Sequence, residues 1–168
     1  MAGPLEGIRV VDLTQVVSGP LATMLLADQG AEVVKVEPLG IGGDVTRLPS
    51  YAKAGISALF VNNNRGKRSL ALDLTKEEGK QIVIDLVEQA DVFIQNFRPG
   101  AIERLGLSYE QLKAVNPKLI YCSISGFGPD GPYSDSPVLD PVIHGLTGRV
   151  SRQLNPPILF PYLFNILV

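Results

Sequence analysis

Cysteine, histidine and long hydrophobic runs are scarce in this sequence of 168 residues. The single cysteine, Cys122, excludes an internal disulfide framework, and its apolar surroundings predict a small core residue. With His144 as the only histidine, no Cys/His spacing for a metal site exists. Neither a signal peptide nor an apolar stretch of about 18 residues is found, so we expect a cytoplasmic protein with no membrane partner.

An excess of charge of one sign is also lacking. Fifteen lysines and arginines stand against 17 acidic residues, a net charge of −2. This balance argues against a general nucleic-acid binder, although a local basic cluster can still hold a small polyanion. The sequence is 45% hydrophobic and 19% charged, which is typical of a globular chain of single-domain length.

Short apolar runs alternate with longer segments of helical period. Strands are predicted at residues 8–13, 32–37, 69–74, 91–96 and 118–124, and helices at 18–31, 75–90 and 108–115. The expected helix starts are an N-cap at Ser18 and capping boxes formed by Thr75 with Glu78 and by Ser108 with Gln111. Strand followed by helix, repeated, predicts an α/β fold with a mostly parallel sheet and helices on both faces.

The stretch GFGPDG, residues 126–131, matches the letters of the dinucleotide fingerprint G-x-G-x-x-G. A strand precedes it, but prolines and turn residues follow where the fingerprint requires a helix. An NAD-binding oxidoreductase is therefore a weak alternative. The match predicts a glycine- and proline-rich loop at the carboxyl end of a strand, where ligands bind in parallel sheets.

Several cations flank the predicted strands and are candidates for binding phosphates: Arg65, Lys67, Arg68, Arg98 and Arg104. Asn96 adds amide donors, Phe97 a stacking face, and the helix start at Ser18 free N–H groups. Each cation alone is more typical of a solvated surface. Together, beside glycine- and proline-rich loops, they predict a phosphate-bearing organic ligand.

The C-terminal residues 153–168 carry no charge and include three prolines. Such an apolar end has no visible cover. We expect the chain to be cut off there, with a tail that packs on the domain or on a partner as the alternative. The expected division is an N-terminal ligand-binding part at 1–150 and an apolar tail at 151–168.

Ordered motifs from Leu5 to about Gly148 resemble the N-terminal part of a family III CoA-transferase, the group that includes formyl-CoA transferase and alpha-methylacyl-CoA racemase. They are GIRVVDLTQVVSGPLATMLLADQGAEVVKVEP, GGDVTR, NNNRGKRSLALDL, NFRPGAIERLGLSYEQLKAVNPKLIYCSISGFGPDGPY and DPVIHGLTG. The resemblance implies a Rossmann-like large domain of an interlocked homodimer. It also implies that coenzyme A (CoA) is bound across the strand ends as a substrate, without a further cofactor.

By the same resemblance, the CoA contacts correspond to Val17, Ser18, Leu72, Asp73, Leu74, Thr75, Asn96, Phe97, Arg98, Arg104 and the segment 137–140, which includes Leu139 and Asp140. Some relatives have an arginine in place of Pro38 and a lysine in place of Pro137. We therefore expect two CoA contacts to be missing or replaced.

The resemblance implies a reaction in which an aspartate attacks an acyl-CoA thioester and CoA passes to a carboxylic acid. The position of that aspartate falls just beyond Val168, so no catalytic residue is assigned, and Asp140 is expected to be an N-cap. The racemase branch uses a histidine where this chain has Leu139, which favours CoA transfer over 2-methylacyl-CoA racemisation. A non-catalytic CoA-binding remnant is the remaining alternative.

Overall fold

The computed structural model describes residues 3–40, 42–48, 52–53 and 56–149. It divides into two compact units, Met1–Ser125 and Gly126–Val168, which are described separately. The predicted tail at 151–168 lies outside the described residues. Among the residues that are described, no helix is long and apolar enough to cross a membrane.

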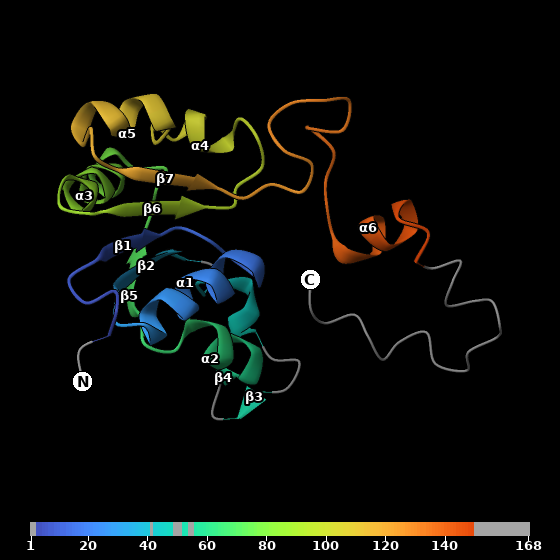
Figure 1. The fold of residues 1–168 in the computed structure, drawn as a ribbon, viewed down its shortest axis with the longest axis horizontal. Coiled ribbons are helices and arrows are strands. Elements are labelled where there is room, and N and C mark those ends of the chain that lie inside the picture. Colours follow the sequence, from blue (N-terminus) through green and yellow to red (C-terminus); the bar gives the residue numbers. More distant parts are fainter. Residues whose placement is uncertain (1–2, 41, 49–51, 54–55, 150–168) are drawn as a thin grey trace. The chain divides into compact units, whose positions relative to one another are not determined.

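Five parallel strands form the sheet of the first unit (Figure 1). In chain order they are β1 (Arg9–Asp12), β2 (Glu32–Pro38), β5 (Arg68–Leu72), β6 (Val92–Gln95) and β7 (Ile120–Ser123). Their order across the sheet is β5-β2-β1-β6-β7. The chain thus winds outward from β1 in both directions, which is the doubly wound topology of Rossmann-like folds. All five predicted strands are confirmed, with ends that differ by at most two residues.

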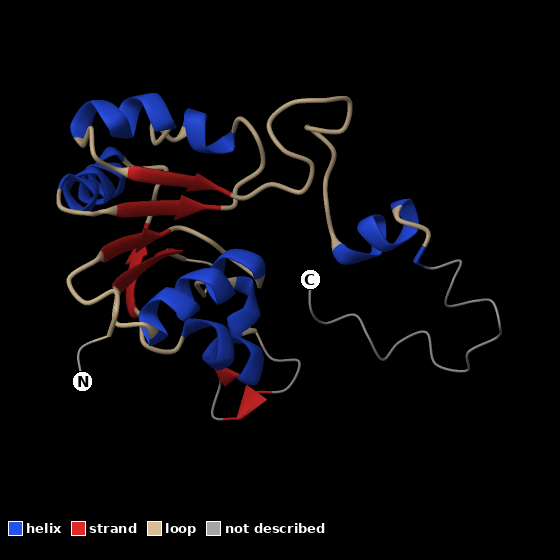
Figure 2. Cartoon of the chain, in the orientation of Figure 1, coloured by secondary structure: helices blue, strands red, loops and turns tan. Residues whose placement is uncertain are grey.

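Helices lie on both faces of this sheet (Figure 2). On one face, α1 (Ser18–Asp28) packs on β1 and β2, and α2 (Ala58–Asn64) packs on α1. On the other face, α3 (Glu77–Glu88) contacts β1 and α5 (Tyr109–Val115), and the short α4 (Ala101–Arg104) precedes α5. The predicted α/β fold is confirmed, whereas α2 and α4 have too few periodic residues to be recognised in the sequence.

A small excursion separates β2 from α2. It contains the 3₁₀ turn η1 (Val45–Arg47) and the antiparallel pair β3 (Ala52–Lys53) and β4 (Ile56–Ser57). Ser57 caps α2 by accepting a hydrogen bond from the Phe60 N–H, and its hydroxyl donates to the Thr46 carbonyl. The excursion is thereby tied to the start of α2.

Two apolar clusters fill the space between sheet and helices. The larger contains Val11, Val83, Phe93, Leu107 and Leu112, all at most 3% exposed, on the α3 and α5 face. The smaller, on the α1 face, contains Val10, Val33 and Ile94. Cys122 packs against this smaller cluster and is half-buried, more exposed than the predicted core position.

The helix starts confirm one capping prediction and correct two. Ser108 and Gln111 form the predicted capping box of α5. Ser18 is the first residue of α1, after a Val17 N-cap that makes no side-chain bond. Thr75 lies before the Lys76 N-cap of α3, and its hydroxyl donates to Asp73 instead of the helix. Asp73 competes for the same turn, so the predicted box with Glu78 does not form.

The second unit begins with the glycine- and proline-rich loop, and its only described helix is α6 (Asp140–Leu146). No described helix follows GFGPDG directly, as the sequence predicted. Asp140 is the first helical residue and Leu139 is the N-cap, so the expected N-cap role of Asp140 is wrong. Pro141 at the second helical position favours this start, because it needs no N–H acceptor there.

Candidate functional site

Two cavities lie at the carboxyl ends of the strands in the first unit. The first, of about 210 Å³, is lined by Leu13, Gln15, Val36, Glu37, Pro38, Leu39, Leu72, Asp73, Leu74, Thr75, Phe97 and Leu105. The second, of about 230 Å³, is lined by Leu13, Gln15, Val16, Asn96, Phe97 and Arg98. They share Leu13, Gln15 and Phe97 and therefore adjoin at the end of β1.

Seven sequence-predicted site residues line these cavities. Residues 72–75 line the first, Asn96 and Arg98 the second, and Phe97 both. Val17 and Ser18 directly follow Val16 of the second cavity, and Arg104 directly precedes Leu105 of the first. Leu139 and Asp140 belong to the second unit, so they are not placed with the others.

A tight turn shapes the wall after β5. The Asp73 carboxylate accepts hydrogen bonds from the Thr75 N–H at 2.9 Å and from its hydroxyl at 2.7 Å. These bonds lower the pKa of Asp73. A β-carbon at Gly79 in α3 would lie 2.2 Å from the Asp73 carbonyl oxygen. Only glycine lets the first turns of α3 approach the cavity wall this closely.

Amide side chains hold the loops after β1 and β6. Asn96 accepts from the Gln15 N–H at 2.9 Å and donates to the Gln15 carbonyl at 2.8 Å. Gln95 is 3% exposed. It accepts from the Phe97 N–H and donates to the Ser123 hydroxyl, both at 2.7 Å. Asn96 was predicted to offer amide donors to a ligand, but its side chain is engaged with the neighbouring loop.

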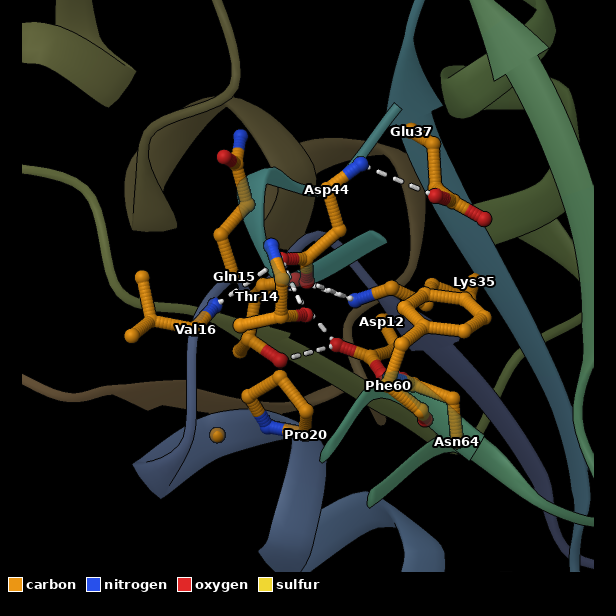
Figure 3. Close-up of polar contacts among 12 residues, drawn as sticks. Asp12, Thr14, Gln15, Val16, Pro20, Lys35, Glu37, Asp44, Phe60 and Asn64 are labelled. Carbon is orange, nitrogen blue, oxygen red and sulfur yellow. Dashed lines mark hydrogen bonds and ion pairs between the residues drawn. The ribbon is translucent and has the colours of Figure 1, made fainter. Parts of the chain in front are cut away.

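Buried charges lie beneath the loop after β1 (Figure 3). Lys67 forms an ion pair with Asp12 at 3.0 Å and also donates to the Pro20 carbonyl and Asn64. Lys35 forms an ion pair with Asp44 at 3.0 Å and donates to the Thr14 carbonyl at 2.6 Å. Burial lowers the pKa of Lys67, opposed by the Asp12 charge. Lys67 is therefore a buried structural cation, which corrects its prediction as a phosphate ligand.

Glu37, near the end of β2, is saturated with hydrogen bonds. Its carboxylate accepts from Arg47 Nε and Nη2 at 2.7 Å each, from the Asp44 N–H at 3.0 Å and from the Ser69 hydroxyl at 2.7 Å. Burial by itself raises the pKa of a carboxyl group, but these bonds more than offset it, and the pKa of Glu37 is lowered from 4.5 to about 2. The guanidinium of Arg47 also lies 3.8 Å from the ring centre of Phe60.

Only part of the predicted cation set faces the cavities. Arg65 is paired with Asp28, and Arg68 begins β5, so it lies at the amino edge of the sheet. Arg98 lines the second cavity, and Arg104 ends α4 beside the first. Both are exposed, and neither forms an ion pair with any residue that the structure describes. Of the five predicted cations, these two arginines are the ones that lie at the cavities without an ion-pair partner among the described residues.

Sequence reasoning missed the residues that hold the site from below, which are Gln15, Lys35, Glu37 and Asp44. A signal for two of them was present, because Lys35 and Glu37 interrupt the apolar run of β2 with charges. Buried charges in a strand require partners. The partners Asp44 and Arg47 lie in an irregular segment, so their pairing could not be read from periodicity.

The first unit thus combines a doubly wound sheet, two cavities at the carboxyl edge and two exposed arginines beside them, and the carboxyl edge is where open α/β sheets generally bind ligands. The family model of CoA-transferase family III matches residues 5–159. The chain belongs to this family.

Curated relatives and solved structures agree with this assignment. The chain is 46% identical over 160 residues to the succinate–glutarate CoA-transferase of Agrobacterium fabrum, covering 91% of this chain and 40% of that protein. It is 43% identical over 146 residues to the acetyl-CoA:oxalate CoA-transferase of Acetobacter aceti, covering 87% and 37%. A CAIB/BAIF family protein from Brucella suis superimposes with a TM-score of 0.81 at 44% identity, covering 88% and 40%. The chain thus spans about two fifths of the length of these relatives.

Proposed function

We propose that this chain forms the CoA-binding part of a CoA-transferase that moves CoA from an acyl-CoA thioester to a carboxylic acid. The observation that carries the proposal is the pair of adjoining cavities at the carboxyl ends of β1, β5 and β6. Residues 72–75 and 96–98, to which the family resemblance assigns CoA contacts, are among the residues that line them.

The chemistry of the cavity walls suits the parts of CoA. Val36, Leu72 and Leu74 supply apolar surface for the adenine ring in the first cavity. Arg98 and Arg104 are free to form charge-assisted hydrogen bonds with phosphates. The loop after β1 offers backbone groups to the pantetheine arm between the two cavities. The assignment of Leu139 and Asp140 as CoA contacts rests on the family resemblance alone.

The reaction follows the scheme implied by the family. A carboxylate of the whole protein attacks the thioester carbonyl, CoA thiolate leaves, and a mixed anhydride forms. The thiolate then attacks the enzyme carbonyl of that anhydride and releases the donor acid, leaving an enzyme–CoA thioester. The acceptor carboxylate attacks this thioester in turn, which releases CoA thiolate and forms a second mixed anhydride. The thiolate then attacks the acceptor carbonyl of that anhydride, which gives the new acyl-CoA and frees the enzyme carboxylate. The two relatives named above are CoA-transferases for oxalate and for succinate and glutarate, so a dicarboxylic acceptor is the first to test.

Three alternatives are weaker. An NAD-binding oxidoreductase of this topology commonly uses an acidic side chain beyond β2 to accept the ribose hydroxyl. Here the carboxylate of Glu37 already accepts four hydrogen bonds, which is about its full capacity.

Racemisation lacks support because Leu139 stands where the racemase branch has histidine. A non-catalytic CoA-binding remnant would keep the same cavities, and only turnover by the whole protein separates it from a transferase. The interlocked homodimer and the cytoplasmic location also remain proposals.

Calorimetric titration of the 168-residue chain with CoA and with NAD tests the proposal. We expect saturable CoA binding, no NAD binding, and about tenfold weaker CoA binding for Arg104→Ala, because one charge-assisted contact to a phosphate is lost. Lys118→Ala is the matched control, since Lys118 is exposed just before β7 at the opposite edge of the sheet. Saturable NAD binding, or equal CoA affinity for Arg104→Ala and the parent, would contradict this assignment.

A further inference from the structure

The loop after β1 contains a residue in an unusual backbone conformation. Val16 has φ of 72°, the only positive φ among the described residues other than glycine. A β-branched side chain is disfavoured in this region, and such strain persists only where the surroundings hold the backbone. Val16 is 46% exposed, so packing of its own side chain does not hold it. The restraint must therefore act on the backbone groups of the loop.

Three side chains supply that restraint from three separate elements. Asn96 of the loop after β6 binds both backbone groups of Gln15. Lys35 of β2 donates to the Thr14 carbonyl at 2.6 Å. Asp44 lies within 3.4 Å of the Val16 N–H and pairs with Lys35 at 3.0 Å. Figure 3 shows Lys35 and Asp44 converging on residues 14–16.

The Lys35–Asp44 ion pair is almost completely buried, with side chains at most 1% exposed. A buried ion pair is weak evidence for a stabilising role, because desolvation offsets its attraction. Both members instead end at the backbone of the strained loop. We propose that Lys35 and Asp44 are positioning residues, which hold the turn at Gln15 and Val16 so that Val17 and Ser18 face CoA. This inference rests on the proposed function and deepens it.

The second buried pair supplies a matched comparison. The side chains of Lys67 and Asp12 are also at most 2% exposed and 3.0 Å apart. Lys67, however, donates to the Pro20 carbonyl and Asn64. Asp12 reaches residues 14–16 only through Oδ1, which accepts from the Thr14 N–H and hydroxyl, and an asparagine at position 12 keeps this oxygen. Replacing both members of a pair together leaves no buried charge without its partner. The two double variants are therefore similar in charge, size and burial.

Hydrogen–deuterium exchange and CoA titration of two double variants test the inference. In Lys35→Met/Asp44→Asn, we expect the amides of Gln15, Val16 and Val17 to exchange about tenfold faster, and CoA to bind about tenfold more weakly, since a backbone anchor is lost. In Lys67→Met/Asp12→Asn, both quantities should stay close to those of the parent. Asn at position 44 keeps Oδ1, which accepts from Thr46 and from the Val16 N–H, so η1 remains capped and the anchor that is lost is the Lys35 bond to the Thr14 carbonyl.

Adding Val16→Gly provides a readout that a merely structural role would not move. Glycine adopts positive φ without strain. The triple variant Lys35→Met/Asp44→Asn/Val16→Gly should therefore regain most of the lost CoA affinity. Any stability that was lost with the buried ion pair should not return, because the pair is still absent. Equal effects of the two pairs on loop exchange, or no rescue by Val16→Gly, would overturn the inference. Absence of CoA binding by the parent chain would instead count against the proposed function, while loop exchange still decides the role of the pair.

Discussion

The two faces of the parallel sheet are stabilised by different kinds of interaction. On the α3 and α5 face, the apolar cluster runs along whole strands, from Phe93 and Val11 to Leu13 and Leu72, and its end becomes the wall of the first cavity. On the α1 face, the apolar cluster ends along β1 and β2 with Val10 and Val33. Further along the same strands, that face carries charged side chains.

The strand period explains this division. Asp12 pairs in register with Lys35, and because side chains alternate along a strand, both point away from the large cluster. Non-directional apolar packing stabilises one face, whereas directional ion pairs and hydrogen bonds fix atoms of the other face in place. The loop after β1 lies where the two faces meet, at the mouth of both cavities. A binding loop of defined shape thus needs both kinds of support.

The largest expected loss of stability on the polar face comes from Lys67→Met. This change leaves the buried Asp12 carboxylate without its cation, and we expect a loss of about 3 to 5 kcal/mol in the free energy of unfolding, measured by urea denaturation. Lys67→Met/Asp12→Asn should recover most of this loss. If the double variant were as unstable as the single one, Lys67 would act through its packing and not through its charge.

Acid should weaken the polar face before the apolar one. The pKa of Glu37 is about 2 in the folded chain, below its ordinary value of 4.5. Its contribution is therefore complete above about pH 4.5 and is lost as the pH falls toward 2. The shift corresponds to about 3 kcal/mol. Urea denaturation between pH 6 and pH 2 measures it, and Glu37→Gln should show a shallower loss over this window. Parallel curves for the two chains would assign the acid sensitivity to other groups.

The apolar face should respond by volume and not by pH. Leu112 in α5 is 1% exposed. Its replacement in Leu112→Ala should cost at least about 2 kcal/mol, because transfer energy is lost and a cavity is left. The loss should be the same at pH 4 and pH 7. A loss that grew in acid would mean that the two faces are energetically coupled.

The smallest expected effect concerns the end of a helix on the apolar face. Ser108→Ala removes the capping box of α5 and should lower stability by about 1 kcal/mol. Thr75→Ala is the informative companion, because Thr75 bonds to Asp73 and caps no helix. It should change stability less, while loosening the wall after β5. Thermal denaturation of both variants distinguishes the helix-capping role of Ser108 from the turn-forming role of Thr75.

How far the sequence predicted the molecule depends on the kind of interaction. Apolar periodicity located every strand of the sheet, because strand burial follows from local pattern. The Ser108 box was read correctly from two residues in adjacent turns. Ser18 was misread because Val17 is the N-cap of α1, and Thr75 was misread because its hydroxyl donates to Asp73 while Lys76 is the N-cap of α3. Local rules do not tell which of two neighbouring residues begins a helix.

The residues around the cavities were named from the sequence, but the contacts that hold them were not. The family resemblance pointed to residues 72–75, and strand ends pointed to residues 96–98; both groups line the cavities. The same reasoning placed Lys67 among phosphate ligands, because a lysine in a glycine-containing loop is ordinarily exposed. Its pairing with Asp12 joins residues 55 positions apart in sequence. Such partners are set by the three-dimensional fold, which no local pattern encodes.

The pairing of every acidic group on the polar face with a cation affects the electrostatic attraction of a ligand. Asp12, Glu37 and Asp44 are matched one for one by Lys67, Arg47 and Lys35. Opposite charges about 3 Å apart cancel at distances well beyond their separation, so these six groups contribute little to the potential outside the molecule. The field at the cavity mouths is then left to exposed cations such as Arg98 and Arg104. Attraction of a polyanion toward this edge is therefore set at the rim, and added salt should slow the encounter without loosening the buried framework beneath it.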